Sequence, residues 1–168
     1  MKKYEFTGEV KRIKLIGTEV VLRRIRAVTA FGVVEAGDIG GWIEKEENLS
    51  HDGSAWVHSS AWVYGDARVY GDARVCGNAE VCGDAEVYSA NHIFSIGPVG
   101  SRDGHTTFYR CKNKKIEVRC GCFNGRIEEF IEKVAETHGK NKHASVYRAA
   151  AEIAKLQIEP LSTDKEAE

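Results

Sequence analysis

The sequence predicts a mainly β fold built from stacked coils of very short strands, and two observations support this prediction. A six-residue period runs without insertion through six units from Ala55, with alanine at the first position and valine at the third. The chain also holds 17 glycines against 2 prolines in its 168 residues. Glycine suits sharp corners and proline is avoided where each strand needs its N–H, so this imbalance fits the same fold.

Each Ala-x-Val triplet is expected to form one short strand. Alternate side chains of a strand share a face, so alanine and valine point inward and the middle residue points outward. Gly-Asp or Gly-Asn at four junctions supplies a corner, because glycine tolerates positive φ and Asp or Asn hydrogen-bonds to its own backbone. Three six-residue units then close one coil of 18 residues. The pattern resembles the left-handed parallel β-helix of hexapeptide-repeat proteins, and that resemblance implies a trimer or another homo-oligomer.

Stacking at this spacing places Trp56 over Arg74, Trp62 over Glu80 and Arg68 over Glu86. It also predicts an outward-facing apolar surface made of large aromatic residues. Such a surface packs against a second subunit or the flanking segments, or it binds a partner. The candidate partner-binding aromatics are Trp56, Trp62, Tyr64, Tyr70 and Tyr88.

The segments on either side of the repeat are expected to cap it. Residues 1–37 have β-branched stretches broken by glycine and predict an N-terminal β cap, followed by the β-helix over 38–100. Residues 101–159 predict a β-hairpin and a helical hairpin, with Asn124 as the first helix N-cap and a second helix from about Ala144 to Gln157. Residues 160–168 are expected to be a disordered acidic tail. The whole therefore combines a mainly β solenoid with a small α+β module.

A basic patch on the C-terminal hairpin is a second candidate partner surface. It comprises Arg110, Lys112, Lys114, Lys115 and Arg119, with Phe108, Tyr109 and Phe123 interleaved. Phosphate neutralisation with base stacking would use these residue types, which makes nucleic acid or a nucleotide one possible partner. An acidic protein surface would suit the patch equally well, and a solvated loop is the third interpretation.

The five cysteines indicate reduced thiols, because their number is odd and the chain begins without a secretion signal. Cys111 is expected opposite Cys120 across the hairpin. With Cys122 and His105 they could form a Cys₃His zinc site, although free buried thiols explain the same residues. No other cofactor is expected.

Catalytic motifs are few. The sequence has no P-loop, Rossmann fingerprint, nucleophile elbow or H-E-x-x-H motif. Many hexapeptide enzymes are acyltransferases in which a coil histidine acts as base on the acceptor, with acyl-CoA between subunits, and His51 and His58 are the candidates here. The repeats lack the projecting loop that such enzymes usually carry, which favours a non-enzyme. No apolar run approaches a membrane span, so a cytoplasmic location in a bacterial cell is expected.

Three segments together resemble a hexapeptide-repeat family of bacteriophages and prophages with no assigned function. They are the Gly40–Ser50 stretch GGWIEKEENLS, the A-x-V-x-G-D/N array, and RCGCF at 119–123 leading into IEEF at 127–130. The resemblance implies a fold and a phage context but no reaction. It favours an oligomeric, non-enzymatic protein that occludes or sequesters a host protein, a nucleoprotein or a nucleotide signal, as an anti-defence factor such as a CRISPR inhibitor would. An acyltransferase and a purely structural trimer are the alternatives.

Overall fold

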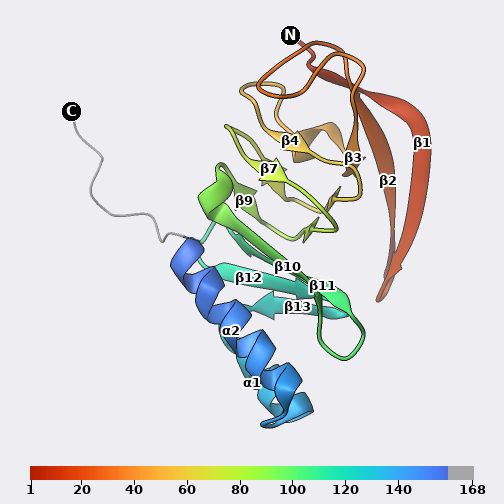
Figure 1. Cartoon of the computed structure of the whole chain (residues 1–168). Helices are drawn as coiled ribbons and strands as arrows, with labels where there is room; N and C mark the ends of the chain where they lie inside the picture. Colours follow the sequence, from red (N-terminus) through yellow and green to blue (C-terminus); the bar gives the residue numbers. More distant parts are fainter. Residues whose placement is uncertain (159–168) are drawn as a thin grey trace, which may run out of the picture. The chain divides into compact units, whose positions relative to one another are not determined.

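The computed structural model describes residues 1–158, which form two compact units (Figure 1). The first unit is Met1–Ala90 and the second begins at Asn91. The expected acidic tail over 160–168 lies outside the described residues.

Short parallel strands form the centre of the first unit, as the period of six predicts. In each stack, residues 18 apart face one another: Trp56 pairs with Arg74, Trp62 with Glu80 and Arg68 with Glu86. All six repeat alanines and all six repeat valines are at most 1% exposed, which confirms the predicted inner face. The strands are β4 (Trp56–Val57), β5 (Trp62–Val63), β6 (Arg68–Val69), β7 (Arg74–Val75), β8 (Glu80–Val81) and β9 (Glu86–Val87).

The corners between these strands depend on glycine. Gly65, Gly71, Gly77 and Gly83 have φ values of 68°, 66°, 63° and 65°. This is the left-handed region that side chains with a Cβ rarely adopt. Each corner therefore turns the chain toward the next stack without strain.

The coil before the repeat is irregular. Strand β3 (Ile39–Ile43) pairs in parallel with β5, but Trp42 faces Trp62, which is 20 residues away instead of 18. Leu49, which follows the 3₁₀ turn η1 (Glu46–Asn48), likewise bridges to Val69 at a spacing of 20. These two extra residues explain why the sequence phase is lost just before Ala55.

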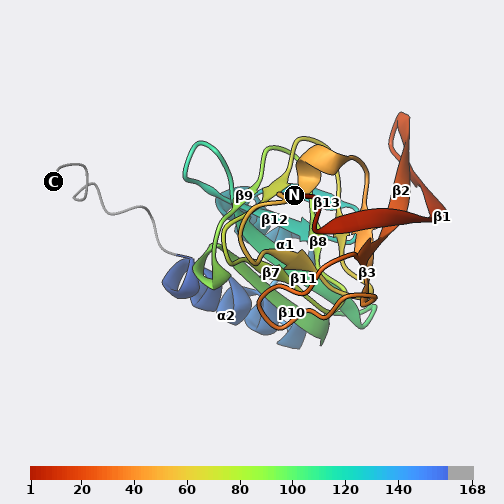
Figure 2. The same ribbon diagram turned by 90° about the horizontal axis from the view of Figure 1, so that it is seen from above.

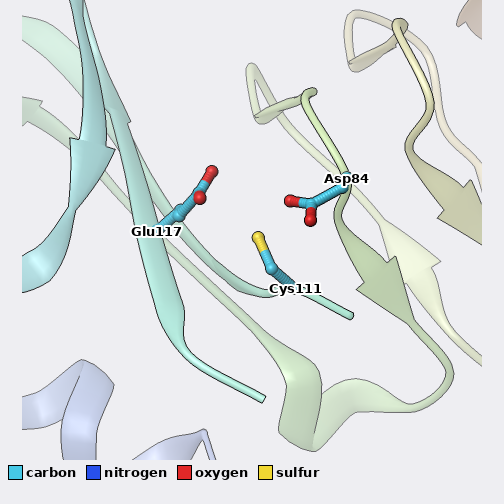
Figure 3. Close-up of side chains that lie close together, drawn as sticks. All are labelled: Asp84, Cys111 and Glu117. Carbon is cyan, nitrogen blue, oxygen red and sulfur yellow. The ribbon is translucent and has the colours of Figure 1, made fainter. Parts of the chain in front are cut away.

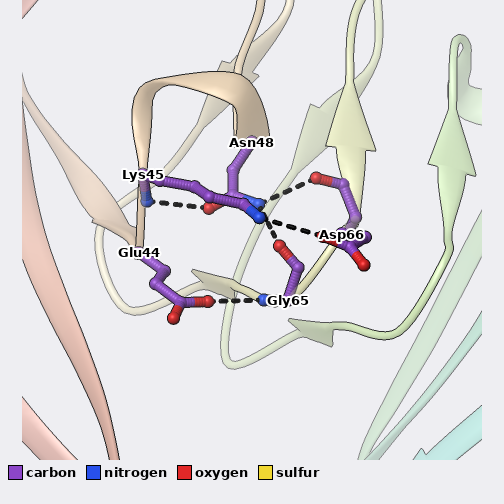
Figure 4. A network of polar contacts seen from close by, with 6 residues as sticks. Glu44, Lys45, Asn48, Gly65 and Asp66 are labelled. Atoms are coloured by element: carbon purple, nitrogen blue, oxygen red, sulfur yellow. Dashed lines mark hydrogen bonds and ion pairs between the residues drawn. The ribbon is translucent and has the colours of Figure 1, made fainter.

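A buried asparagine locks this first coil onto the next one (Figure 4). The Asn48 side chain donates to the carbonyls of Gly65 at 3.1 Å and Ala67 at 2.9 Å, and it accepts from the Lys45 amide at 2.9 Å. The Glu44 carboxylate accepts from the Gly65 amide at 2.7 Å. Asn48 itself is 0% exposed, so these bonds satisfy polar groups that water does not reach.

The N-terminal segment forms a long antiparallel hairpin of β1 (Tyr4–Leu15) and β2 (Thr18–Ala27), whose strands lie side by side in both views (Figure 2). Strand β2 also pairs antiparallel with β3, so the hairpin extends the sheet that continues through β5 and β8. The β-rich character predicted for this segment is confirmed.

The second unit is a four-stranded antiparallel sheet with two helices on one face. The predicted phase through Ile93 and Val99 does not continue the repeat, because those residues form one seven-residue strand that pairs antiparallel with the next strand. The Gly-Asp corners end at Gly83-Asp84, so nothing turns the chain into a further coil. The elements are η2 (Ala90–His92), β10 (Ile93–Val99), β11 (Gly104–Arg110), β12 (Ile116–Cys120), β13 (Phe123–Arg126), α1 (Ile127–His138) and α2 (Lys142–Gln157).

The predicted helical hairpin is present, but its first helix begins two residues later than expected. Asn124 lies in β13 opposite Arg119, and Arg126 is the N-cap of α1. The Glu129 carboxylate accepts from the Arg126 amide at 3.2 Å, which satisfies one free donor at the helix start. Neither described helix is long and apolar enough to cross a membrane.

The core of the second unit lies between the sheet and the helices. Phe108 and Val118 on adjacent strands are 0% exposed and pack with Phe130 and Val134 of α1 and with the alanines of α2. Side chains alternate along a strand, so this apolar face excludes Tyr109, Glu117 and Arg119, which lie on the opposite face of the sheet.

We expect Gly71→Ala to destabilise the first unit far more than Gly77→Ala. Both residues have positive φ, which costs alanine about 1 kcal/mol. A Cβ at Gly71 would also lie 2.5 Å from the Tyr88 ring, whereas a Cβ at Gly77 would meet nothing within 4 Å. Urea unfolding should therefore show a loss of about 3 kcal/mol for Gly71→Ala. Equal losses for the two variants would contradict the stacked-corner geometry.

Asn48→Ala should cost about 2–3 kcal/mol of unfolding free energy, because it leaves buried carbonyls without donors. The matched control is Lys45→Ala, which removes the Lys45–Asp66 ion pair of 2.9 Å between two exposed side chains. Solvent screens an ion pair between exposed side chains, so its loss should change the unfolding free energy little. Thermal and urea unfolding of both variants measure the difference, and a milder effect for Asn48→Ala would show that the first coil docks by other contacts.

Candidate functional site

The aromatic residues expected to face outward are largely covered. Trp56 is 2% exposed and Tyr64 is 4% exposed, while Trp62 and Tyr70 are half-buried. Tyr88, at 50% exposed, packs against Tyr70 with ring centroids 5.2 Å apart. The continuous apolar surface predicted from the repeat is therefore wrong in extent, because alternation along a strand places a side chain outside the coil but does not say what covers it.

The N-terminal segment supplies that cover for the two tryptophans. Tyr4 and Phe31 contact the Trp56 ring edge-on, with centroids 6.4 Å and 5.4 Å away. The Lys11 ammonium lies 5.0 Å from the Trp62 ring and 4.5 Å from the Trp42 ring. Packing against flanking segments was one of the two interpretations of these aromatics, and the structure supports it for Trp56 and Trp62.

The basic hairpin of the second unit presents its lysines but not its aromatic rings. Lys112, Lys114 and Lys115 are exposed on the β11–β12 turn, which is closed by hydrogen bonds from the Cys111 amide to the Lys115 carbonyl and from the Lys114 amide to the Cys111 carbonyl. Arg110 is buried at the end of β11 and Arg119 is half-buried in β12. Phe108 and Tyr109 are both 0% exposed, so neither ring can stack on a base, whereas Phe123 is half-buried at the start of β13.

The candidate zinc residues are spread along the second unit. Cys120 faces Thr106, not Cys111, and Cys111 lies at the other end of the hairpin beyond the Arg110–Ile116 pair. The Cys120 thiol accepts from the Thr106 hydroxyl at 3.1 Å, and Cys122 is exposed on the turn after it. Within the described residues, the proposed set of Cys111, Cys120, Cys122 and His105 does not converge on one point. The predicted pairing is wrong because the turn is centred near Asn113, which places Cys111 beside Lys115 and Cys120 opposite Thr106.

The hairpin instead brings Cys111 near a carboxylate. Figure 3 shows the Cys111 thiol and the Glu117 carboxylate, both carried by the hairpin of the second unit. Asp84, also labelled there, belongs to a Gly-Asp corner of the first unit. Cys111 and Glu117 by themselves supply two donors, which is fewer than a structural zinc site needs.

The two candidate catalytic histidines lie in the first unit and differ in what binds their rings. His51 Nδ1 accepts a hydrogen bond from the Lys3 amide at 3.3 Å, and its ring stacks on Tyr4 with centroids 4.2 Å apart. The proton of the neutral ring therefore sits on Nε2, which is buried and without a partner among the described residues. The basic lone pair of His51 is already used, so this residue is suited to holding the N-terminus and not to taking a proton.

His58 is half-buried, and the hydrogen bonds that hold it in place run through its backbone. Its backbone is fixed on both sides, because its amide donates to the Val75 carbonyl at 2.8 Å and its carbonyl accepts from the Ala61 amide at 2.9 Å. Neither ring nitrogen makes a hydrogen bond within the part of the chain that the structure describes, and Nε2 is buried. Burial, with the nearby Arg74 cation, lowers the pKa of His58, and Asp38 opposes this shift. This shift favours the neutral form of His58, which is the form that acts as a base.

Sequence reasoning missed the residues that fix this region. Lys3 is 4% exposed, and its ammonium donates to the Ala55 carbonyl at 2.8 Å and lies 4.8 Å from the Phe31 ring. The Tyr4 hydroxyl donates to the Leu49 carbonyl at 2.9 Å. Neither residue belongs to a periodic pattern, so no sequence signal distinguishes them from the other polar residues of the N-terminus.

Comparison with known proteins gives one informative similarity. No protein-family model matches the chain. The chain is 37% identical over 62 residues to a curated protein of Escherichia coli K12 named "Uncharacterized acetyltransferase YdcK". The match covers 34% of this chain and only 19% of the length of that relative.

This similarity overturns the function favoured by the sequence. The scarcity of catalytic motifs and the predicted exposure of the aromatic residues favour a non-enzymatic anti-defence protein. The relative is named an acetyltransferase, and Trp56 and Tyr64 are buried within the chain, so both grounds are weakened. The acyltransferase alternative fits these findings better.

The burial of Lys3 predicts a measurable pH dependence of stability. Burial lowers the pKa of Lys3 from 10.5 to about 8. Between these values the unfolded chain binds the Lys3 proton and the folded chain does not, so stability rises with pH in this window. The unfolding free energy of the native chain should therefore increase from pH 8 to 10.5 relative to that of Lys3→Met, as measured by urea unfolding. Parallel curves for the two proteins would show that Lys3 keeps its ordinary pKa.

Proposed function

We propose that this protein is an acyltransferase that takes its acyl group from acyl-CoA and that its first unit is a left-handed parallel β-helix. The similarity to a protein named an acetyltransferase carries the proposal. The fold gives support, because the Ala-x-Val strands pair in parallel at a spacing of 18 residues, as in the hexapeptide-repeat proteins that the sequence resembles.

His58 is the proposed general base. In its neutral form it takes the proton from an acceptor hydroxyl or amine, whose oxygen or nitrogen then attacks the thioester carbonyl of the acyl-CoA. The C–S bond breaks as the new ester or amide bond forms, and the imidazolium returns its proton to the leaving thiolate. No external oxidant or further reactant is needed, so acceptor and acyl-CoA give acylated acceptor and CoA.

The proposed enzyme acts as a homo-oligomer, with a trimer as the expected state. His58 lies at an outward position of the coil, where Gly40 of the first unit bridges to its backbone. A second copy placed against this face would enclose the acceptor and exclude water from the thioester. Light scattering coupled to size exclusion measures the mass, and a strictly monomeric active enzyme would remove this part of the proposal.

The direct experiment is acetyl-CoA binding followed by thiol release. Acetyl-CoA should raise the melting temperature of the full chain, and free CoA should form when hydroxyl or amine acceptors such as sugars, aminoglycosides and polyamines are added. Free adenosine diphosphate controls for non-specific nucleotide binding. The absence of both a thermal shift and thiol release would reject the acyltransferase proposal.

We expect His58→Asn to lower kcat by about 10²–10⁴-fold, since this is the range that a positioned general base contributes. The matched control is His51→Asn, which should reduce stability through its lost contact with the Lys3 amide but leave kcat within a few-fold. Steady-state kinetics and thermal unfolding of the two variants separate these effects. Equal activity of His58→Asn and the native chain would exclude His58 as the base.

A further inference from the structure

Two histidine side chains meet at the connection between the helices of the second unit. His138 is the last residue of α1 and His143 is the second residue of α2. Their ring centroids are 5.6 Å apart, with planes inclined by 56°. Both side chains are half-buried. Nothing in the proposed acyl transfer uses them.

The connection that brings the two rings together is well defined. Gly139 ends α1 with φ of 56°, and its amide donates to the Ala135 carbonyl. The Asn141 amide donates to the His138 carbonyl at 3.1 Å, and the Asn141 side chain caps α2 by accepting from the Ala144 amide at 3.0 Å. The His138 ring also packs near Tyr147, one turn after His143, at 5.7 Å. Much of the entropy of bringing the two imidazoles together is thus lost on folding, before any ligand binds.

The ring nitrogens of this pair are available. Neither histidine makes a hydrogen bond through its ring within the described part of the chain, and neither has a buried nitrogen without a partner. Their lone pairs can therefore reach a ligand from solvent. His138 lies at the C-terminus of α1, where the helix dipole favours positive charge, whereas His143 lies in the first turn of α2, where the dipole opposes it.

The separation of the rings fits a shared metal ion. A first-row metal binds imidazole nitrogen at about 2.0–2.1 Å, so two rings on one tetrahedral ion hold their centroids about 5 Å apart. A small side-chain rotation brings the observed 5.6 Å to this value. Imidazole is a preferred ligand of zinc, nickel and copper, whereas calcium and magnesium take oxygen ligands.

We propose that His138 and His143 form a binding site for a divalent first-row transition metal, Zn²⁺, Ni²⁺ or Cu²⁺, which links α1 to α2. Two protein ligands leave the other positions to water. Lys140 and Lys142 are exposed in the same connection, and Arg148 donates to the Gly139 carbonyl at 3.0 Å. These cations weaken the attraction for a metal ion, so the affinity depends on the imidazole bonds, and calcium and magnesium should not bind.

The test is a titration of the full reduced chain with Ni²⁺, followed by calorimetry and by NMR of the histidine side chains. The native protein should bind Ni²⁺ at micromolar concentration, with line broadening of His138 and His143 and a higher melting temperature. His138→Gln and His143→Gln should each weaken binding at least tenfold. The control His105→Gln changes a histidine of β11 outside the pair and should leave binding unchanged.

The cysteine thiolates are the competing ligands for Ni²⁺, and the charge-transfer spectrum distinguishes them from the imidazoles. A thiolate-to-metal charge-transfer band, with binding unaffected by either glutamine variant, would show that Ni²⁺ binds cysteine and would overturn the proposal. Absence of binding by the native chain would overturn it as well. If a glutamine variant unfolds, the side-chain broadening in the native protein still decides which residues hold the metal. The outcome is independent of acetyl-CoA binding, so it leaves the proposed enzyme activity untouched.

Discussion

The stacking of one coil on the next is the constraint on which the first unit depends. Each strand has only two residues, so a single strand pair contributes few hydrogen bonds and gains stability only from the column of valines and alanines inside. That column requires every corner to turn at the same place, and glycine at positive φ makes the turn without strain. A change at one corner therefore disturbs the coils on both sides of it, as the contact between Gly71 and Tyr88 illustrates.

A stack of this kind has an end that must be covered, and the covering segment creates the most constrained region of the unit. Asn48 satisfies the carbonyls of the next coil, while Lys3 and Tyr4 satisfy those of the first one. His51 is used in the same way, as a hydrogen-bond acceptor for the N-terminal backbone. His58, one strand later, has its backbone fixed but its ring unbound, which is the combination that general-base catalysis requires.

Two observations favour an acyltransferase over a binding protein. Aromatic residues that suggested a docking surface are covered by Tyr4, Phe31 and Lys11, and the similarity over 62 residues is to a protein named an acetyltransferase. That similarity covers 34% of this chain and 19% of the length of the relative. The second unit contributes a separate feature, the His138–His143 pair, whose chemistry does not depend on acyl transfer.

The sequence by itself determined the stacked strands, the inner alanines and valines, the glycine corners and the helical hairpin, because each follows from a local period or a local backbone preference. It also indicated His58 as one of two candidate bases. Only the tertiary structure shows that the His51 ring accepts a hydrogen bond from the Lys3 amide, which distinguishes it from His58. Only the tertiary structure shows that Cys120 faces Thr106 and that Ile93–Val99 is a strand of another sheet. These outcomes depend on register and on contacts between residues far apart in the chain, such as Lys3 with Ala55, which no local pattern encodes.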